Sequence, residues 1–264
     1  VWGAWCAKKL NKPFMADLYD NFEGFGQARI PGMKHLLCQA VCQAQLVTTT
    51  SQPLAELVIH DYAAQAKVVC LPSTVDLSTF RSGNKSNARE RFGLLSNKQY
   101  IGTAGGLYKD KGVEVIYQAW EKLKHEMPNV HLVLAGPYQP DYPPPEEERV
   151  HYLGSLAHHE ISTLFQALDL GIISILDTPF GRYCFPQKAY EMLACDLPVV
   201  VANIGEMSYL FRDSPQVLFQ TGNANDLASK IQQQLQSPQQ QSIVVEDWAT
   251  IIERLEPMIT ALKF

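Results

Sequence analysis

The sequence predicts an α/β protein built on parallel sheets, and two observations carry this prediction. Short apolar runs alternate with helix-forming segments along most of the chain. Strand, helix and strand at this spacing indicate βαβ units, whose strands lie parallel. The second observation is the run Leu197–Ala202, which is rich in Val, as is typical of a strand buried on both faces of a parallel sheet.

Composition limits the classes of protein that the chain can represent. Its 264 residues are 46% hydrophobic and 19% charged, which suits one large or two small globular domains. A formal charge of −5 argues against a nucleic-acid binder. No apolar run approaches a membrane span, and no signal-peptide pattern begins at Val1. Six cysteines without metal-ligand spacing predict reduced thiols in a cytoplasmic protein.

The first third of the chain predicts three strands separated by helices. The strands are expected over 14–18, 46–49 and 67–71, and the helices over 1–10, 31–44 and 53–64. Ligands collect at the carboxyl ends of strands in such sheets, so Tyr19 and Asp20 are expected at a crevice. The alternative is a polar turn with local hydrogen bonds only.

The remaining two thirds predict a larger unit of the same kind. Strands are expected over 100–104, 130–135, 150–153, 170–176, 197–202 and 216–220, and helices over 113–126, 158–168, 187–195, 223–236 and 246–262. The polar stretch 81–98 is expected to be a linker with a short helix.

A glycine-rich turn joins the first strand of this larger unit to its helix. Gly105 and Gly106 would let the backbone approach a phosphate closely, and Lys111 at the helix start would neutralise its charge. A bare glycine pair can also serve only to relieve a tight turn.

A second candidate phosphate site lies in the stretch 180–202. Arg182, Pro186, Lys188 and Glu191 cluster around an expected helix start. Such a start offers unpaired N–H groups and positive potential. Glu191 could accept hydrogen bonds from ligand hydroxyls. The alternative is an ordinary amphipathic helix with a solvated lysine and glutamate.

Two motifs in these stretches resemble those of a known family. The pattern P-x-K-x-x-E followed by P-V-V, and the pattern G-x-L-x-x-x-K-G, are similar to the donor-site segments of GT-B glycosyltransferases of family 4, the glycosyl transferases group 1. The resemblance implies a GT-B fold, with a Rossmann-like donor-binding domain and a partial second Rossmann-like domain.

The resemblance also implies a domain division. Residues 1–76 would form a partial amino-terminal, acceptor-side domain, 77–245 the nucleotide-sugar-binding domain, and 246–264 a terminal helix packing back on the amino-terminal part. The chain begins inside an apparent helix, so we expect it to lack an upstream portion of the first domain.

Roles for individual residues follow from the same resemblance. Lys111 and Lys188 would hold the donor diphosphate, and Glu191 the ribose. The expected donor-site set is Gly105, Gly106, Lys111, Leu156, Pro186, Lys188, Glu191 and Gly205; the expected catalytic set is Tyr19, Asp20, Lys111 and Arg182. The chain departs from the family pattern at Tyr183, Gly106 and Tyr19, where the family has Glu, Arg and His.

The implied function is transfer of a sugar from a nucleotide diphosphate sugar to an acceptor, with retention of configuration and without a metal or other cofactor. The acceptor would be a glycan, a lipid-linked molecule or a small molecule. Two alternatives remain. One is a non-catalytic nucleotide-sugar-binding or scaffold subunit, which the three departures favour. The other is a nucleotide-sugar epimerase, which shares the GT-B layout.

Overall fold

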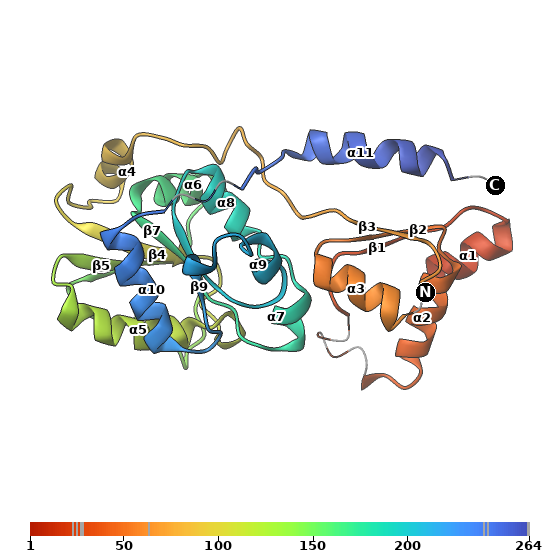
Figure 1. Cartoon of the computed structure of the whole chain (residues 1–264), viewed down its shortest axis with the longest axis horizontal. Coiled ribbons are helices and arrows are strands. Elements are labelled where there is room, and N and C mark those ends of the chain that lie inside the picture. Colours follow the sequence, from red (N-terminus) through yellow and green to blue (C-terminus); the bar gives the residue numbers. More distant parts are fainter. Residues whose placement is uncertain are drawn as a thin grey trace. The chain divides into compact units, whose positions relative to one another are not determined.

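The computed structural model describes residues 1–22, 24, 26, 29–62, 64–239, 241 and 243–262. The chain divides into two compact units, and the colours in Figure 1 give the residue numbers of the segments that form them. Unit 1 comprises Val1–Thr74, Thr178–Phe185 and Glu246–Phe264; unit 2 comprises Val75–Asp177 and Pro186–Val245. The domain boundaries expected from the sequence, at 76 and 245, stay a prediction. Within the described part of the chain, no helix is long and apolar enough to cross a membrane.

Unit 1 contains a three-stranded parallel sheet in the order β1-β2-β3. The strands are β1 (Met15–Leu18), β2 (Leu46–Thr49) and β3 (Lys67–Cys70), and the helices are α1 (Trp2–Leu10), α2 (Met33–Gln43), α3 (Gln52–His60), α7 (Pro179–Tyr183) and α11 (Trp248–Thr260). Ser51 caps α3, because its hydroxyl oxygen accepts a hydrogen bond from the Leu54 N–H at 3.2 Å. Val47, Leu54 and Val58 lie in the core between β2 and α3.

Unit 2 contains a six-stranded parallel sheet in the order β6-β5-β4-β7-β8-β9. Its strands are β4 (Gln99–Ala104), β5 (Val130–Ala135), β6 (Val150–Tyr152), β7 (Leu170–Ile173), β8 (Val199–Ala202) and β9 (Leu218–Phe219). Counted within the unit this is the order 3-2-1-4-5-6 of a Rossmann sheet. The predicted fold class, α/β with Rossmann-like parallel sheets, is confirmed.

Helices cover both faces of this sheet (Figure 1). They are α4 (Lys85–Arg91), α5 (Val113–Glu126), α6 (His158–Ala167), α8 (Lys188–Ala194), α9 (Gly205–Leu210) and α10 (Ala224–Gln236), with 3₁₀ turns at Lys109–Lys111 and Pro215–Val217. On one face α5 packs against α10, and on the other α6 packs against α8. Trp120, Leu132 and Ile172 are fully buried in the core under α5 and α10.

Several predicted elements differ from the structure at their ends. The helix 113–126 and the strand 130–135 have the predicted bounds. The strand predicted over 216–220 shortens to Leu218–Phe219, because the preceding residues form a 3₁₀ turn. Helix α8 begins at Lys188 with Gln187 as its N-cap residue, so Pro186 precedes the helix. Helix α7 forms within a stretch that the sequence indicated as a loop.

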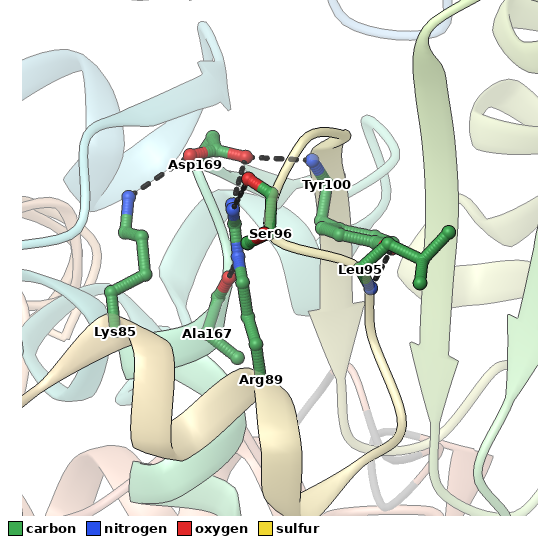
Figure 2. A network of polar contacts seen from close by, with 7 residues as sticks. All are labelled: Lys85, Arg89, Leu95, Ser96, Tyr100, Ala167 and Asp169. Atoms are coloured by element: carbon green, nitrogen blue, oxygen red, sulfur yellow. Dashed lines mark hydrogen bonds and ion pairs between the residues drawn. The ribbon is translucent and has the colours of Figure 1, made fainter.

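An ion pair between the buried Arg89 and the half-buried Asp169 helps to hold the amino ends of β4 and β7 together (Figure 2). The Asp169 carboxylate, just before β7, accepts hydrogen bonds from the Tyr100 N–H of β4 at 2.7 Å and from the Arg89 guanidinium of α4 at 2.6 Å. Lys85 adds a third contact at 3.0 Å, but its side chain is 49% exposed. One carboxylate therefore ties a helix to the two central strands.

Arg89 extends this network to the backbone. Its side chain is 8% exposed, and it donates to the carbonyl oxygens of Ala167 at 3.0 Å and Ser96 at 3.1 Å. Its guanidinium lies 5.1 Å from the centre of the Tyr100 ring. The Tyr100 hydroxyl in turn accepts a hydrogen bond from the Leu95 N–H at 2.8 Å (Figure 2). Each of the three guanidinium nitrogens thus donates a hydrogen bond, and the buried charge has an anionic partner, as a buried charge requires.

Two histidines on neighbouring strands form a second cluster. The His131 and His151 rings stack at 5.2 Å, and a hydrogen bond of 2.9 Å joins His131 Nδ1 to His151 Nε2. Burial lowers the pKa of both rings. For His131 the charges of His151, Lys98 and Arg149 lower the pKa further, while Glu148 opposes them. The native pair therefore favours the neutral form.

We expect Asp169→Asn to lower the free energy of unfolding of unit 2 by about 3 kcal/mol, because it leaves the buried Arg89 guanidinium without its counter-charge. Lys85→Met is the matched control and should cost less than about 1 kcal/mol, since the Lys85 contact is exposed. Urea unfolding of both variants measures this difference. Equal losses would contradict the assigned role of Arg89.

We expect the free energy of unfolding of unit 2 to decrease as the pH is lowered below about 6.5, the ordinary pKa of histidine in an unfolded chain. The folded-state pKa values are lowered, so the histidine pair stabilises the fold above that pH and loses this contribution as the pH falls through the folded-state pKa. Thermal unfolding of wild type and His151→Gln across this range measures the effect. The variant should lose less stability on acidification; parallel curves would contradict the proposal.

Candidate functional site

The carboxyl ends of β4 and β7 mark the point where the chain changes direction in the sheet. From β4 the chain continues to β5 on one side, and from β7 to β8 on the other. The two strands are paired at Ile101–Leu170 and Gly102–Gly171, in the middle of β4 and at the amino end of β7. Ligands of open α/β sheets bind in the crevice at such a switch point.

The loop after β4 lies directly against the loop after β5. Gly105 has φ +112° and Gly136 φ +119°, a backbone region that favours glycine. A Cβ atom on Gly136 would collide with the Gly105 carbonyl oxygen. The Gly105 N–H also donates to the Ala135 carbonyl at 3.0 Å. Close backbone packing therefore fixes the Gly105 loop at the crevice.

The start of α5 is fixed against the end of β7. The Ser174 hydroxyl donates to the Gly112 carbonyl oxygen at 3.0 Å, and a Cβ atom on Gly112 would collide with that hydroxyl. Gly112 has φ +70° and is the N-cap residue of α5. Lys111, in the 3₁₀ turn just before it, is half-buried. The amino end of a 14-residue helix thus lies at the carboxyl edge of the central strands.

Lys188 lies close to the Gly105 loop although it comes from a distant part of the sequence. Its Nζ is 3.5 Å from the Thr103 hydroxyl oxygen at the end of β4. A Cβ atom on Gly105 would lie 3.5 Å from the same Nζ. The structure therefore brings together two of the residues predicted for the donor site, one on each side of the switch point.

The position of α8 depends on a glycine in β7. A Cβ atom on Gly171 would lie 2.5 Å from the Met192 sulfur and 3.1 Å from a Leu197 methyl carbon. Met192 is fully buried on the inner side of α8. The absence of a side chain at Gly171 therefore lets α8, with Lys188, approach the sheet closely.

Glu191 follows Lys188 by one helical turn and is half-buried. Burial raises the pKa of its carboxyl group above the ordinary value, and the charges of His158 and Lys188 partly offset this. A raised pKa with defined charged neighbours is typical of functional sites, although structural networks can produce it too.

The other predicted donor-site residues lie around the same sheet. Gly106 follows Gly105, and a Cβ atom there would collide with the Tyr108 ring. Gly205 is the first residue of α9, with φ +53°. Leu156 is half-buried in the loop before α6. The Pro186 carbonyl accepts a hydrogen bond from the Ala189 N–H at 2.9 Å. No distance joins these residues into one site, so their roles stay predictions.

Three of the predicted catalytic residues belong to unit 1. The Tyr19 side chain is 58% exposed after β1, and its carbonyl oxygen accepts a hydrogen bond from the Thr50 hydroxyl at 2.8 Å. Asp20 follows it and is half-buried. Arg182 lies exposed on α7. Their participation in a site with Lys111 stays a prediction.

Sequence reasoning missed two residues at the switch point. Thr103 and Ser174 are buried hydroxyl side chains, 3% and 5% exposed, at the carboxyl ends of two apolar strands. Each contacts a loop or helix start at the crevice. The sequence could have indicated them, because each is a hydroxyl residue at the end of an apolar run that is expected to be buried. A buried hydroxyl group needs a nearby hydrogen-bond partner.

Comparison with known proteins places this geometry in a family. The family model described as glycosyl transferases group 1 matches residues 98–237, more than half of the chain. The D-inositol 3-phosphate glycosyltransferase of Stackebrandtia nassauensis is 27% identical over 202 residues, covering 70% of this chain and 44% of that protein. The protein of the same name from Mycobacterium tuberculosis is 26% identical over 181 residues, with 64% and 36% covered. The chain thus spans less than half the length of these curated relatives.

Solved structures share the fold. Sucrose-phosphate synthase from Thermosynechococcus elongatus superposes with a TM-score of 0.77 at 18% identity, covering 98% of this chain and 72% of that one. HepE from Anabaena, solved in complex with UDP, superposes with a TM-score of 0.81 at 21% identity, with 98% and 75% covered. The Rossmann order of the sheet in unit 2 agrees with the family match over residues 98–237. The chain belongs to the glycosyl transferases group 1.

Proposed function

We propose that unit 2 binds the diphosphate of a nucleotide sugar at the switch point, and that the protein transfers the sugar to an acceptor hydroxyl. The observation that carries this proposal is the approach of Lys188 to the Gly105 loop, with Nζ 3.5 Å from Thr103 Oγ1. An ammonium group beside a glycine loop at the carboxyl edge of a Rossmann sheet suits a phosphate.

Three features of unit 2 support diphosphate binding at this place. The Gly105 loop lets a ligand approach the backbone closely, since Gly105 itself carries no side chain. The amino end of α5 contributes positive potential. Lys111, next to that helix end, adds a second ammonium group. Glu191, on the same helix as Lys188, would accept hydrogen bonds from the ribose hydroxyls.

The proposed reaction breaks the bond between the sugar C1 and the diphosphate oxygen. The nucleoside diphosphate leaves with the electron pair, the acceptor oxygen forms the new bond to C1, and the proton of the acceptor hydroxyl passes to the departing diphosphate oxygen. Lys111 and Lys188 would stabilise the charge that develops on the leaving diphosphate. Retention of configuration, independence of a metal, and roles for Tyr19, Asp20 and Arg182 rest on the family resemblance. A UDP sugar is the first donor to test, since HepE was solved with UDP.

A second candidate function is nucleotide-sugar binding without transfer. The observation that favours it is the Tyr108 ring, which occupies the space that a side chain at Gly106 would need, where the family has an arginine. The crevice then has fewer cations for the leaving group. Release of UDP from UDP-glucose distinguishes the two functions: turnover supports transfer, whereas tight binding without UDP release supports the binding function.

We expect Lys188→Met to weaken UDP-glucose binding by on the order of 1–3 kcal/mol, the range for loss of a charged hydrogen-bond partner. Lys111→Met should have an effect of the same order. Calorimetry of the purified chain measures both affinities. The control is Lys122→Met, since Lys122 is exposed on α5, away from its amino end. Affinity that is unchanged in both crevice variants would refute the diphosphate site.

We expect Glu191→Gln to change stability and affinity in opposite directions. Burial raises the folded-state pKa of Glu191, so its contribution to stability is present at low pH and is lost as the pH rises through that pKa. At neutral pH the variant should therefore unfold at a higher temperature than wild type, yet bind UDP-glucose more weakly. Thermal unfolding and calorimetry measure the two quantities. A variant that loses stability without losing affinity would assign Glu191 to the core instead.

A further inference from the structure

A pocket lies at the carboxyl edge of unit 2, beside β8 and β9. Its volume is about 530 Å³, and residues that line it include Asp177, Asn203, Ile204, Thr221, Asp226 and Lys230. These come from the loops that follow β7, β8 and β9 and from α10. We call it the β9 pocket. A volume of this size is within the range of small-molecule sites.

Hydrogen bonds between the loops give the β9 pocket a defined wall. The Gln220 N–H donates to the Asp226 carboxylate at 2.6 Å, and the Thr221 hydroxyl donates to the Asn203 carbonyl oxygen at 3.2 Å. The Asn203 side-chain oxygen accepts a hydrogen bond from the Ser208 hydroxyl at 2.8 Å. The segments 203–208 and 220–226 are thereby joined and fixed before any ligand arrives, which reduces the entropy lost on binding.

The wall offers both donors and acceptors. Among the described residues, Lys230 takes part in no ion pair or hydrogen bond, although it is half-buried. The Asn203 amide nitrogen adds further donors, and Asp177 and Asp226 contribute carboxylates. Ile204 and Leu218 supply apolar surface. Two carboxylates beside one ammonium group disfavour an anion such as phosphate.

A sugar ring matches this combination. Each hydroxyl both donates and accepts hydrogen bonds, which suits a wall with amide, ammonium and carboxylate groups. The C–H face of the ring suits the apolar surface of Ile204 and Leu218. We propose that the β9 pocket binds an uncharged sugar unit of a glycan acceptor. The role of that glycan as acceptor rests on the proposed function, whereas the binding of a sugar does not.

The chain connects this pocket to the switch point. Ser174 contacts the start of α5, and Asp177, three residues later in the same loop, lines the β9 pocket. A glycan held in the pocket therefore lies along the edge of the sheet that also carries the Gly105 loop. Binding of its sugar unit would add affinity for glycans over single hydroxyl compounds.

The test is an NMR titration of the ¹⁵N-labelled chain with neutral disaccharides: maltose, cellobiose and mannobiose. We expect at least one of them to shift the backbone amide signals of Asn203 and Thr221 in a saturable way. Lys230→Met should weaken that binding about tenfold, the effect of losing one charged hydrogen bond. Thr221→Trp, which fills the pocket, should abolish it, and far-UV circular dichroism checks that both variants fold.

Lys188→Met separates this inference from the proposed function, because it should weaken UDP-glucose binding and leave disaccharide binding unchanged. Thr221→Trp should do the reverse. The inference is overturned if no disaccharide shifts the Asn203 and Thr221 signals. It is also overturned if Lys230→Met and Thr221→Trp bind disaccharide as tightly as wild type, because the sugar then binds elsewhere.

Discussion

The carboxylate of Asp169 is the constraint on which unit 2 depends. It accepts hydrogen bonds from the Tyr100 N–H of β4 and from the Arg89 side chain of α4, and Asp169 is the residue immediately before β7. The two strands come from different halves of the sheet order and are paired at two residue pairs, in the middle of β4 and at the amino end of β7. A charge contact closes the amino end of this junction, and the carboxyl end is left for loops and helix starts.

The contacts at that carboxyl end are made largely by backbone and small side chains. Gly105, Gly112 and Gly136 occupy positions where a Cβ atom would meet a neighbouring atom or where φ is positive. Thr103 and Ser174 supply hydroxyl groups of minimal size. The backbone at this edge is therefore tightly packed, a form of preorganisation that suits a phosphate site.

The fold was predictable from the sequence where a long helix or strand is bounded by residues that typically begin or end such elements. Helix α5 begins after Gly112, and the strand β5 is an apolar run interrupted only by His131, so both bounds could be predicted. Helix α7 could not, because five residues are too few to show a helical period. Lys188 and Gly105 were predicted from motif spacing. The Tyr108 ring over Gly106 and the hydroxyls of Thr103 and Ser174 depend on contacts between segments that no local pattern encodes.

The bare Cα of Gly171 has a consequence for how this family could vary. The sulfur of Met192 occupies the space that a methyl group at position 171 would take, so the packing of α8 on the sheet depends on the lack of a side chain there. A single added carbon at position 171 would force the side chains of Met192 and Leu197 to move, within and just after the helix that carries Lys188 and Glu191, without touching any ligand. Under the proposed function, such core substitutions would change donor affinity through the positions of Lys188 and Glu191, and a search for specificity confined to residues that contact the ligand would overlook them.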